Sequence, residues 1–220
     1  MSCGTYKRGS LTFLLVVALA VPVFCQSRTR LKWKTRISTT PEVMVEERAL
    51  VRNETNNRYV KIYSTRHPKK TAISNATSTI DFEKRKVAIK VRTYVNSQRT
   101  EACYLMDPIN THDMTMTVNV IKSRNQTQVI DKTAVMDMVV NSNKLTIDDL
   151  KKDYELSRIY KECDKAVVES GLYTIIKGTP SASATSTDPP IDVLGLIPQS
   201  GIHSQHIRIH FNTNPQTAPV

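Results

Sequence analysis

The sequence predicts an α+β fold, and two patterns carry that prediction. From Tyr59 onward, apolar and polar residues alternate with a period of two in short runs such as "YVKIY" and "KVAIKV", which is typical of half-buried strands. From Thr146 onward, apolar residues recur at helical spacing instead. A chain of 220 residues has room for one domain of ordinary size together with flanking segments.

Residues 1–25 have the layout of a signal peptide. Lys7 and Arg8 precede an almost unbroken apolar run over residues 11–25. A membrane-spanning helix needs about 20 apolar residues, so this run is short for one. We therefore expect a secreted protein that passes through the secretory pathway, and an uncleaved type II membrane anchor is the alternative.

Three glycosylation sequons agree with a secreted chain. They begin at Asn53, Asn75 and Asn125, and each has a threonine two positions later. Each sequon alone is a weak signal because so short a motif recurs by chance. We expect a glycoprotein.

Positive charge is concentrated near the N-terminal end. The net charge is +11, and five cations alternate with less polar residues in "RTRLKWKTRI" (28–37). As a strand, this segment would be cationic on one side and half apolar on the other. Residues 26–57 are interpreted as a basic linker; an arm over residues 28–37 that contacts a membrane or a polyanion is the alternative. The rest of the chain is nearly balanced in charge, so no nucleic-acid partner is expected.

Two cysteines, Cys103 and Cys163, remain after the leader. In an oxidising compartment two cysteines suggest one disulfide bond. Two free buried thiols or an intermolecular bridge are the alternatives. A metal site is disfavoured because neither cysteine is accompanied by a second cysteine or by a well-spaced histidine.

The two cysteines belong to different kinds of element. Cys103 begins the short strand "CYLM", which Pro108 closes. The clearest helix begins at Thr146, which forms a capping box with Asp149, and Cys163 follows on the apolar side of the same pattern. A bridge would therefore join a strand to the last turn of a helix.

Four segments together resemble the BRICHOS domain, and within that family its secreted gastrokine-like members. They are "NATSTIDFEKRKVA" (75–88), "CYLM" (103–106), "VNSNKLTIDDL" (140–150) and "IYKEC" (159–163). The resemblance implies a five-stranded antiparallel sheet flanked by two helices and one intradomain disulfide matching Cys103 and Cys163. The BRICHOS-like domain is expected over residues 58–178, between disordered flanking segments.

The resemblance also implies a characteristic aspartate, which matches Asp81. In the family this is a partly desolvated carboxyl group that takes up a proton as the pH falls along the secretory route and loosens the domain. An ordinary outward-facing strand aspartate near Lys84, Arg85 or Lys90 is the alternative.

Beyond residue 178 the composition changes. Residues 179–220 begin as a spacer rich in serine, threonine and proline, which cannot form a packed core. A β-prone segment follows at residues 205–211, where Ile207, Ile209 and Phe211 share one strand face. Such a segment next to a BRICHOS-like domain is what the family would treat as a client.

These interpretations predict a secreted chaperone-like module that binds β-prone or aggregation-prone segments, either its own tail or another chain. Phe82, Tyr104 and Met106 are the expected client-facing residues. A precursor that escorts a bioactive or antimicrobial peptide and a structural secreted glycoprotein are the alternatives. No enzymatic activity, cofactor or metal is expected, since no glycine lies between Ser10 and Ser170 to form a phosphate cradle and no histidine has the context of a catalytic triad.

Overall fold

The computed structural model describes twelve stretches of the chain, which lie between residues 28 and 211. They are residues 28–39, 42–54, 57–65, 73–95, 98–107, 129–131, 135–141, 144–155, 157–169, 171–178, 189–198 and 202–211. The predicted signal peptide lies outside the described residues.

Strands dominate the described residues. The strands are β1 (Arg28–Thr39), β2 (Glu42–Glu54), β3 (Asn57–Thr65), β4 (Ile73–Asp81), β5 (Lys86–Val95), β6 (Gln98–Met106), β7 (Val129–Asp131), β8 (Val135–Val140), β9 (Gly171–Lys177), β10 (Ile191–Pro198) and β11 (Ile202–His210). The helices are α2 (Ile147–Tyr154) and α3 (Arg158–Glu169).

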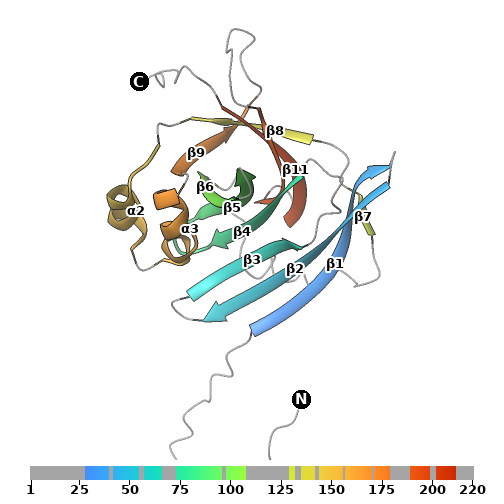
Figure 1. Ribbon diagram of the computed structural model, residues 1–220. Helices are drawn as coiled ribbons and strands as arrows, with labels where there is room; N and C mark the ends of the chain where they lie inside the picture. The colour runs from blue at the N-terminus through green and yellow to red at the C-terminus, as the bar shows by residue number, and fades with distance from the viewer. Residues whose placement is uncertain are drawn as a thin grey trace, which may run out of the picture.

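The strands form one sheet that partly closes on itself. Their order is β10-β11-β8-β9-β6-β5-β4-β3-β2-β1-β7, and β10 also pairs with β4. Seven strands, from β4 round to β10, therefore make a closed barrel, and β3, β2, β1 and β7 extend from β4 as a wing (Figure 1). Wherever two strands that follow one another along the chain pair, they pair antiparallel, whereas the pairs β1–β7, β6–β9, β8–β11 and β4–β10 are parallel.

The predicted α+β fold, a five-stranded antiparallel sheet flanked by two helices and by disordered segments, is wrong, because most of the described residues are strands and seven strands close a barrel. Both helices pack against the same outer face of the barrel, where Leu150 of α2 and Ile159 of α3 share a cluster with Leu105 of β6. The segments expected to flank the domain supply strands of the same sheet: β1 and β2 fall within residues 26–57, and β10 and β11 fall within residues 179–220.

Strand β1 follows the alternation in its sequence. Trp33 and Thr35 are buried, whereas Arg30, Lys32 and Lys34 are exposed. The interpretation of this segment as an unpaired linker is wrong, because β1 pairs with β2 from Arg28↔Arg52 to Thr39↔Glu42. The expectation of one cationic side is confirmed.

The predicted helix is present but interrupted. Thr146 and Asp149 form the expected capping box, with the Asp149 backbone N–H donating to Thr146 Oγ1 at 3.2 Å. That bonding to Thr146 lowers the pKa of the Asp149 carboxyl group. The helix does not continue to Cys163, because a second helix starts after Ser157, whose Oγ accepts a hydrogen bond from the Tyr160 backbone N–H at 3.3 Å.

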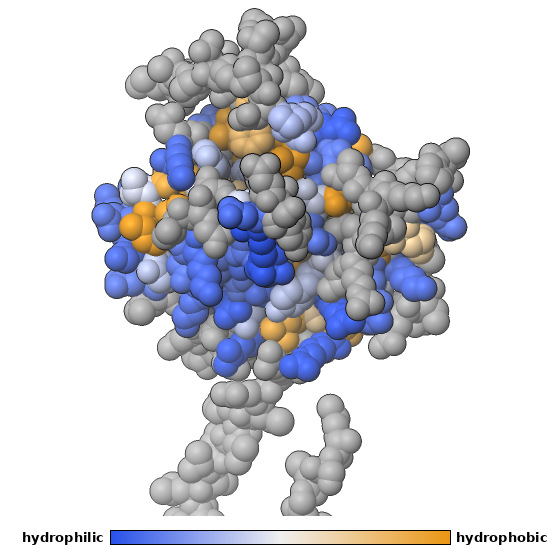
Figure 2. Space-filling view, in the orientation of Figure 1, coloured by the Kyte–Doolittle hydropathy of each residue, from blue (hydrophilic) through white to orange (hydrophobic). Residues whose placement is uncertain are grey.

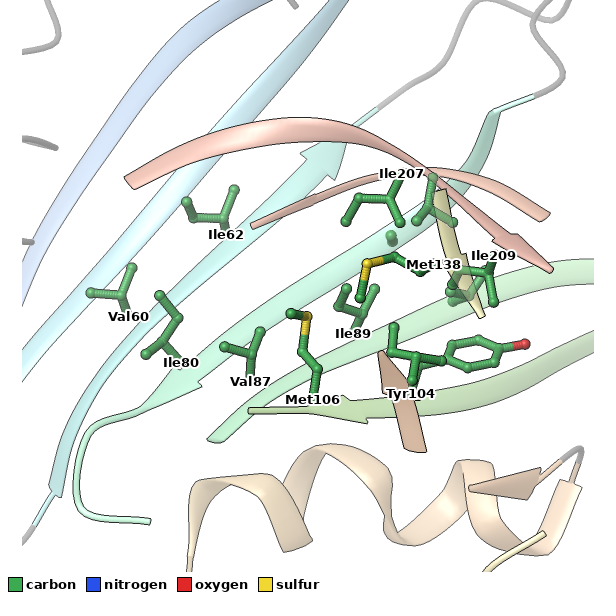
Figure 3. Packing of buried hydrophobic residues seen from close by; sticks show 14 of the residues in the cluster. Val60, Ile62, Ile80, Val87, Ile89, Tyr104, Met106, Met138, Ile207 and Ile209 are labelled. Carbon is green, nitrogen blue, oxygen red and sulfur yellow. The ribbon is translucent and has the colours of Figure 1, made fainter. Parts of the chain in front are cut away.

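The main hydrophobic core fills the barrel interior, which we call the lumen. Strands from both ends of the chain contribute: Ile80 and Ile89 from β4 and β5, and Ile207 and Ile209 from β11 point toward one another (Figure 3). Gly195 of β10 also faces the lumen, where a Cβ atom would lie 2.4 Å from Ile207 Cδ1. The lumen is therefore packed, and glycine at position 195 makes room for Ile207.

The molecular surface contrasts with this interior. In the orientation of Figure 1, hydrophilic residues dominate the visible face, with smaller hydrophobic patches between them (Figure 2). Among the described residues, no helix combines the length and the apolar character that a membrane crossing needs.

Candidate functional site

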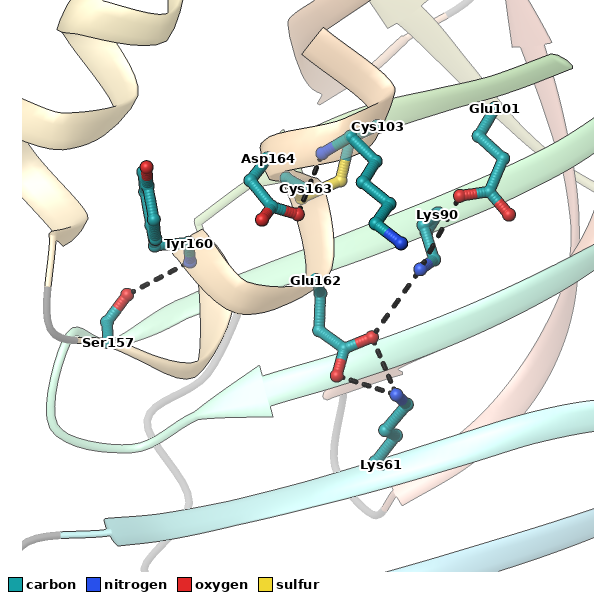
Figure 4. Close-up of a disulfide and its surroundings, with 10 residues drawn as sticks. Lys61, Lys90, Glu101, Cys103, Ser157, Tyr160, Glu162, Cys163 and Asp164 are labelled. Atoms are coloured by element: carbon teal, nitrogen blue, oxygen red, sulfur yellow. Dashed lines mark hydrogen bonds and ion pairs between the residues drawn. A yellow bond between two sulfur atoms is a disulfide. The ribbon is translucent and has the colours of Figure 1, made fainter. Parts of the chain in front are cut away.

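The predicted disulfide is confirmed. Cys103 of β6 and Cys163 of α3 are joined, their Cα atoms lie 5.6 Å apart, and both residues are completely buried. The bond lies in the second hydrophobic cluster, between α3 and the outer face of the barrel (Figure 4). It therefore fixes a helix to the sheet, as the sequence predicted, although Cys163 lies in the middle of α3 and not in the last turn of a helix.

A buried cluster of charged side chains lies beside the disulfide. Lys61 Nζ of β3 donates to both carboxylate oxygens of Glu162 at 2.6 Å (Figure 4). Glu162 also pairs with Arg158 at 2.6 Å. Lys90 of β5 lies 3.8 Å from Glu162 and 3.7 Å from Glu101, so it bridges the two acids. Only 4 % of Glu162 and 4 % of Glu101 is exposed.

Burial and neighbouring cations act in opposite directions on these two carboxyl groups. Burial raises the pKa of Glu162, whereas the hydrogen bond and the charge of Lys61 lower it, and the net result is a lowered pKa. The pKa of Glu101 is also lowered, because Arg99, Lys90 and Arg92 outweigh its burial. Both acids are therefore held in the charged state that the cluster needs.

Asp81 lies at the end of β4, where the chain turns toward β5. Only 4 % of it is exposed. Its Oδ1 accepts hydrogen bonds from the backbone N–H groups of Glu83 and Lys84 at 3.0 Å each, and its Oδ2 accepts one from the Arg158 backbone N–H at 3.2 Å. Asp81 therefore joins the β4–β5 turn to the start of α3. Its expected role as a pH sensor stays a prediction.

The three expected client-facing residues do not share one exposed surface. Tyr104 and Met106 point into the lumen and are almost fully buried, and Phe82 packs partly buried against the same core (Figure 3). The Tyr104 ring lies 5.9 Å from that of Tyr173 and 6.4 Å from that of Phe211, which follows β11. Burial raises the pKa of the Tyr104 hydroxyl group well above its usual range.

The β-prone tail segment is thus in contact with Tyr104 within the same chain. Strands β10 and β11 form a hairpin, which we call the C-terminal hairpin (residues 191–210). It contributes Val193, Ile207 and Ile209 to the lumen, each with 0 % exposure. The faces predicted for Ile207 and Ile209 are confirmed.

Polar groups on the outer side fasten the C-terminal hairpin. Arg208 donates to both oxygens of Asp192, at 2.8 and 3.1 Å, which ties β11 to β10. His210 Nε2 lies 2.7 Å from Asp137 Oδ1 on β8. Neither ring nitrogen of the partly buried His206 has a hydrogen-bond partner among the described residues, and burial lowers the pKa of its imidazole.

The glycosylation sequons fall in different settings. Asn75 is half-buried on β4, and its sequon threonine, Thr77, is buried. Asn53 lies in β2, and Asn125 lies outside the described residues. Glycosylation of all three stays a prediction.

Two adjoining hollows run along the outer face of the wing. They have volumes of about 420 and 680 Å³ and share Lys32, Arg48 and Tyr63 as lining residues. The smaller also contains Arg30, and the larger also contains Arg92. We call the combined feature the basic groove.

The sequence did not identify several of these groups. Lys61, Glu162 and Arg48 gave no signal, since an outward-facing charged residue in a strand or helix is ordinarily solvated. Their importance arises from pairing between β1, β2 and β3 and from the position of α3, which no local pattern encodes. Within the described residues, no group of three or more His, Cys, Asp or Glu side chains is arranged to hold a metal ion.

Comparison with known proteins gives no assignment, because no protein-family model and no solved structure matches this chain.

Proposed function

We propose that this protein is a secreted, chaperone-like module that captures β-prone segments of other chains on the sheet surface covered by its own C-terminal hairpin. The resemblance of residues 58–176 to BRICHOS domains points to the same activity and is part of this proposal. The observation that carries the proposal is the short seam between β10 and β4, which consists of the pairs Asp192↔Ile73 and Val193↔Ser74.

Backbone pairing is longer within the C-terminal hairpin than between the hairpin and either neighbouring strand. Within it, β10 and β11 pair over eight positions, from Ile191↔Ile209 to Pro198↔Ile202. It pairs with β8 over five positions and with β4 over two. Because local opening follows the weakest set of contacts, the hairpin can leave the barrel as a unit at the β4 seam.

A departing hairpin would uncover the features that bind extended peptides. The edge of β8 and the first residues of β4, Ile73 and Ser74, would present unpaired backbone N–H and C=O groups. Between them, Ile89, Tyr104 and Met138 would offer an apolar surface. Backbone pairing at an open edge, combined with apolar side-chain contacts, is how strands are added to sheets.

The precursor alternative has less support. It requires release of a peptide, yet residues 28–37 and the C-terminal hairpin are both paired strands of one sheet.

The variant Gly195→Val tests the proposal. A Cβ atom at position 195 would lie 2.4 Å from Ile207 Cδ1 and 3.2 Å from Ile89 Cδ1, so valine overpacks the lumen directly beneath the hairpin. The matched control is Gly178→Val at the end of β9, where the nearest atom to an added Cβ, Val139 Cγ2, is 3.7 Å away.

The readout is fibril growth of a synthetic amyloid-forming peptide, followed by thioflavin T fluorescence. We expect G195V to suppress growth at a lower protein concentration than the wild type does, and G178V to behave like the wild type. Equal potency of G195V and the wild type, with the hairpin of G195V shown by limited proteolysis to be released, would overturn the proposal. Near-UV circular dichroism verifies that the rest of each variant stays folded.

A further inference from the structure

We infer that the basic groove is a binding site for a linear sulfated polysaccharide. The cations of the groove lie on the outer face of the sheet and belong neither to the main hydrophobic core nor to the C-terminal hairpin, so this inference goes beyond the proposed function. It rests on the charge, the spacing and the composition of the groove.

Cations outnumber acids in the groove. Arg30, Lys32, Arg48 and Arg92 line it, and Glu46 is the acid among its described lining residues, while Arg92 pairs with the buried Glu101 at 2.8 Å. Glu46 is shared, since it pairs with Lys32 at 2.7 Å and with Arg48 at 3.0 Å. A concave surface with an excess of one charge concentrates the field and attracts ligands of the opposite sign.

Arg30 adds charge that no neighbour offsets. It is exposed, and it makes no ion pair with any of the residues that the structure describes. Lys34 lies on the same side of β1, two residues beyond Lys32. It is exposed as well and has no ion pair in the described part of the chain. An anionic ligand would therefore gain contacts here without displacing an existing pair.

The spacing of these cations favours a polymer over a small anion. Alternate residues of a strand lie about 6.8 Å apart, so Arg30, Lys32 and Lys34 form a straight row along β1. Arg48 of β2 lies opposite Lys32 in the register and adds a second cation at that point, where Glu46 pairs with both. Because paired strands hold the row in place, little ordering of the backbone is needed on binding.

The chemistry of the lining residues disfavours the other polyanions. Single-stranded nucleic acid needs several aromatic platforms for base stacking. Among the described residues that line the groove, Tyr63 alone is aromatic, and Lys61 Nζ lies 4.9 Å from its ring centroid. Insertion into a membrane needs exposed apolar side chains beside the cations, but Trp33 of β1 is 1 % exposed and packs in the core.

A sulfated polysaccharide satisfies both constraints. Its sulfate groups recur along a flexible chain and match the row of cations. Such polymers are found outside the cell, where a chain with a predicted signal peptide and a disulfide would meet them.

The test measures binding of the full-length protein to heparin by isothermal titration calorimetry at several sodium chloride concentrations. The groove variant is R30A/K32A/R48A. The control variant K84A/K161A/K165A removes the same charge from exposed positions on the β4–β5 turn and on α3. The probes are heparin, desulfated heparin, a single-stranded oligonucleotide and vesicles with anionic lipids.

We expect the groove variant to bind heparin about tenfold more weakly or worse, because three of the contacts are lost. The slope of log affinity against log salt should fall by about one for each contact removed. The control variant should keep the affinity and slope of the wild type, and desulfated heparin should bind weakly.

Three results would overturn the inference. They are equal loss of heparin binding in both triple variants, equal binding of desulfated heparin, and tighter binding of the oligonucleotide or the vesicles than of heparin at the same ionic strength. A fourth comes from the single variant R30A, which has lost no described ion pair. Wild-type heparin affinity in both R30A and a folded R30A/K32A/R48A would also refute the inference.

Discussion

Replacing Glu162 with glutamine should destabilise the protein strongly. The substitution keeps the size of the side chain but removes the negative charge that Lys61 contacts at 2.6 Å. Lys61 is 8 % exposed, so its charge would stay buried and uncompensated, and Lys90 would lose one of its two acids. Removing one partner of a buried pair costs about 3–5 kcal/mol.

The expected size can be measured by thermal unfolding. For a chain of about 150–250 residues, each kcal/mol lowers the Tm by roughly 2–4 °C, so E162Q should melt about 6–20 °C below the wild type. The control is E83Q, because Glu83 is exposed in the turn after β4 and exposed substitutions change stability by about 0.5 kcal/mol or less.

A double variant separates the lost charge from the lost packing. K61M/E162L replaces the pair with apolar side chains of similar length, and such replacements of buried pairs are often neutral or stabilising. We expect it to recover most of the stability lost in E162Q. A wild-type Tm for E162Q, or a K61M/E162L variant that melts no higher than E162Q, would refute the reasoning.

Three other predictions concern the disulfide, the hairpin and pH. Cys103→Ser or Cys163→Ser removes the disulfide, which joins residues 60 positions apart, and the chain-entropy model gives a loss of about 4 kcal/mol in the free energy of unfolding. We expect both variants to misfold and to be retained during secretion. Normal secretion of both variants would contradict this. Ile207→Ala should lower the opening free energy of the C-terminal hairpin by about 2–5 kcal/mol in native-state hydrogen exchange, whereas Ile176→Ala, at a half-exposed position on β9, should leave it unchanged. Burial lowers the pKa of His206, so the unfolded state binds a proton at a higher pH than the folded state does. The stability of the hairpin should therefore decrease as the pH falls from about 6.5 toward the folded-state pKa. His206→Gln should remove this part of the pH dependence.

Local features of the chain were predictable from sequence because they depend on near neighbours. The alternation in residues 28–36 assigned the buried and the cationic sides of β1 correctly. The Thr146–Asp149 capping box placed the start of α2. The two cysteines left after the leader predicted the Cys103–Cys163 bond.

The closure of the barrel was not predictable in the same way. It depends on parallel pairing of β11 with β8 and of β10 with β4, between segments more than 60 residues apart in the chain. A strand pattern states which faces are apolar but not which strand is the neighbour. The spacer before residue 191 suggested a separate tail, although Ile207 and Ile209 complete the core.

The charged groups of the site were missed for a related reason. Lys61 and Glu162 are 101 residues apart and meet only because α3 lies across β3, β4 and β5. The basic groove combines cations from β1, β2 and β5, whereas the sequence displayed those of β1 alone as a cluster. Lateral pairing of strands created both features.

Hydrogen–deuterium exchange of the wild-type protein, with and without an excess of a β-prone client peptide, tests the central claim most directly. If the client peptide displaces the C-terminal hairpin from the barrel, the backbone amides of β11 should exchange faster when the client is added. Amides of β5 and β6 should remain protected, because those strands keep their neighbours. Unchanged exchange in β11, at client concentrations where the protein suppresses fibril growth, would contradict the account.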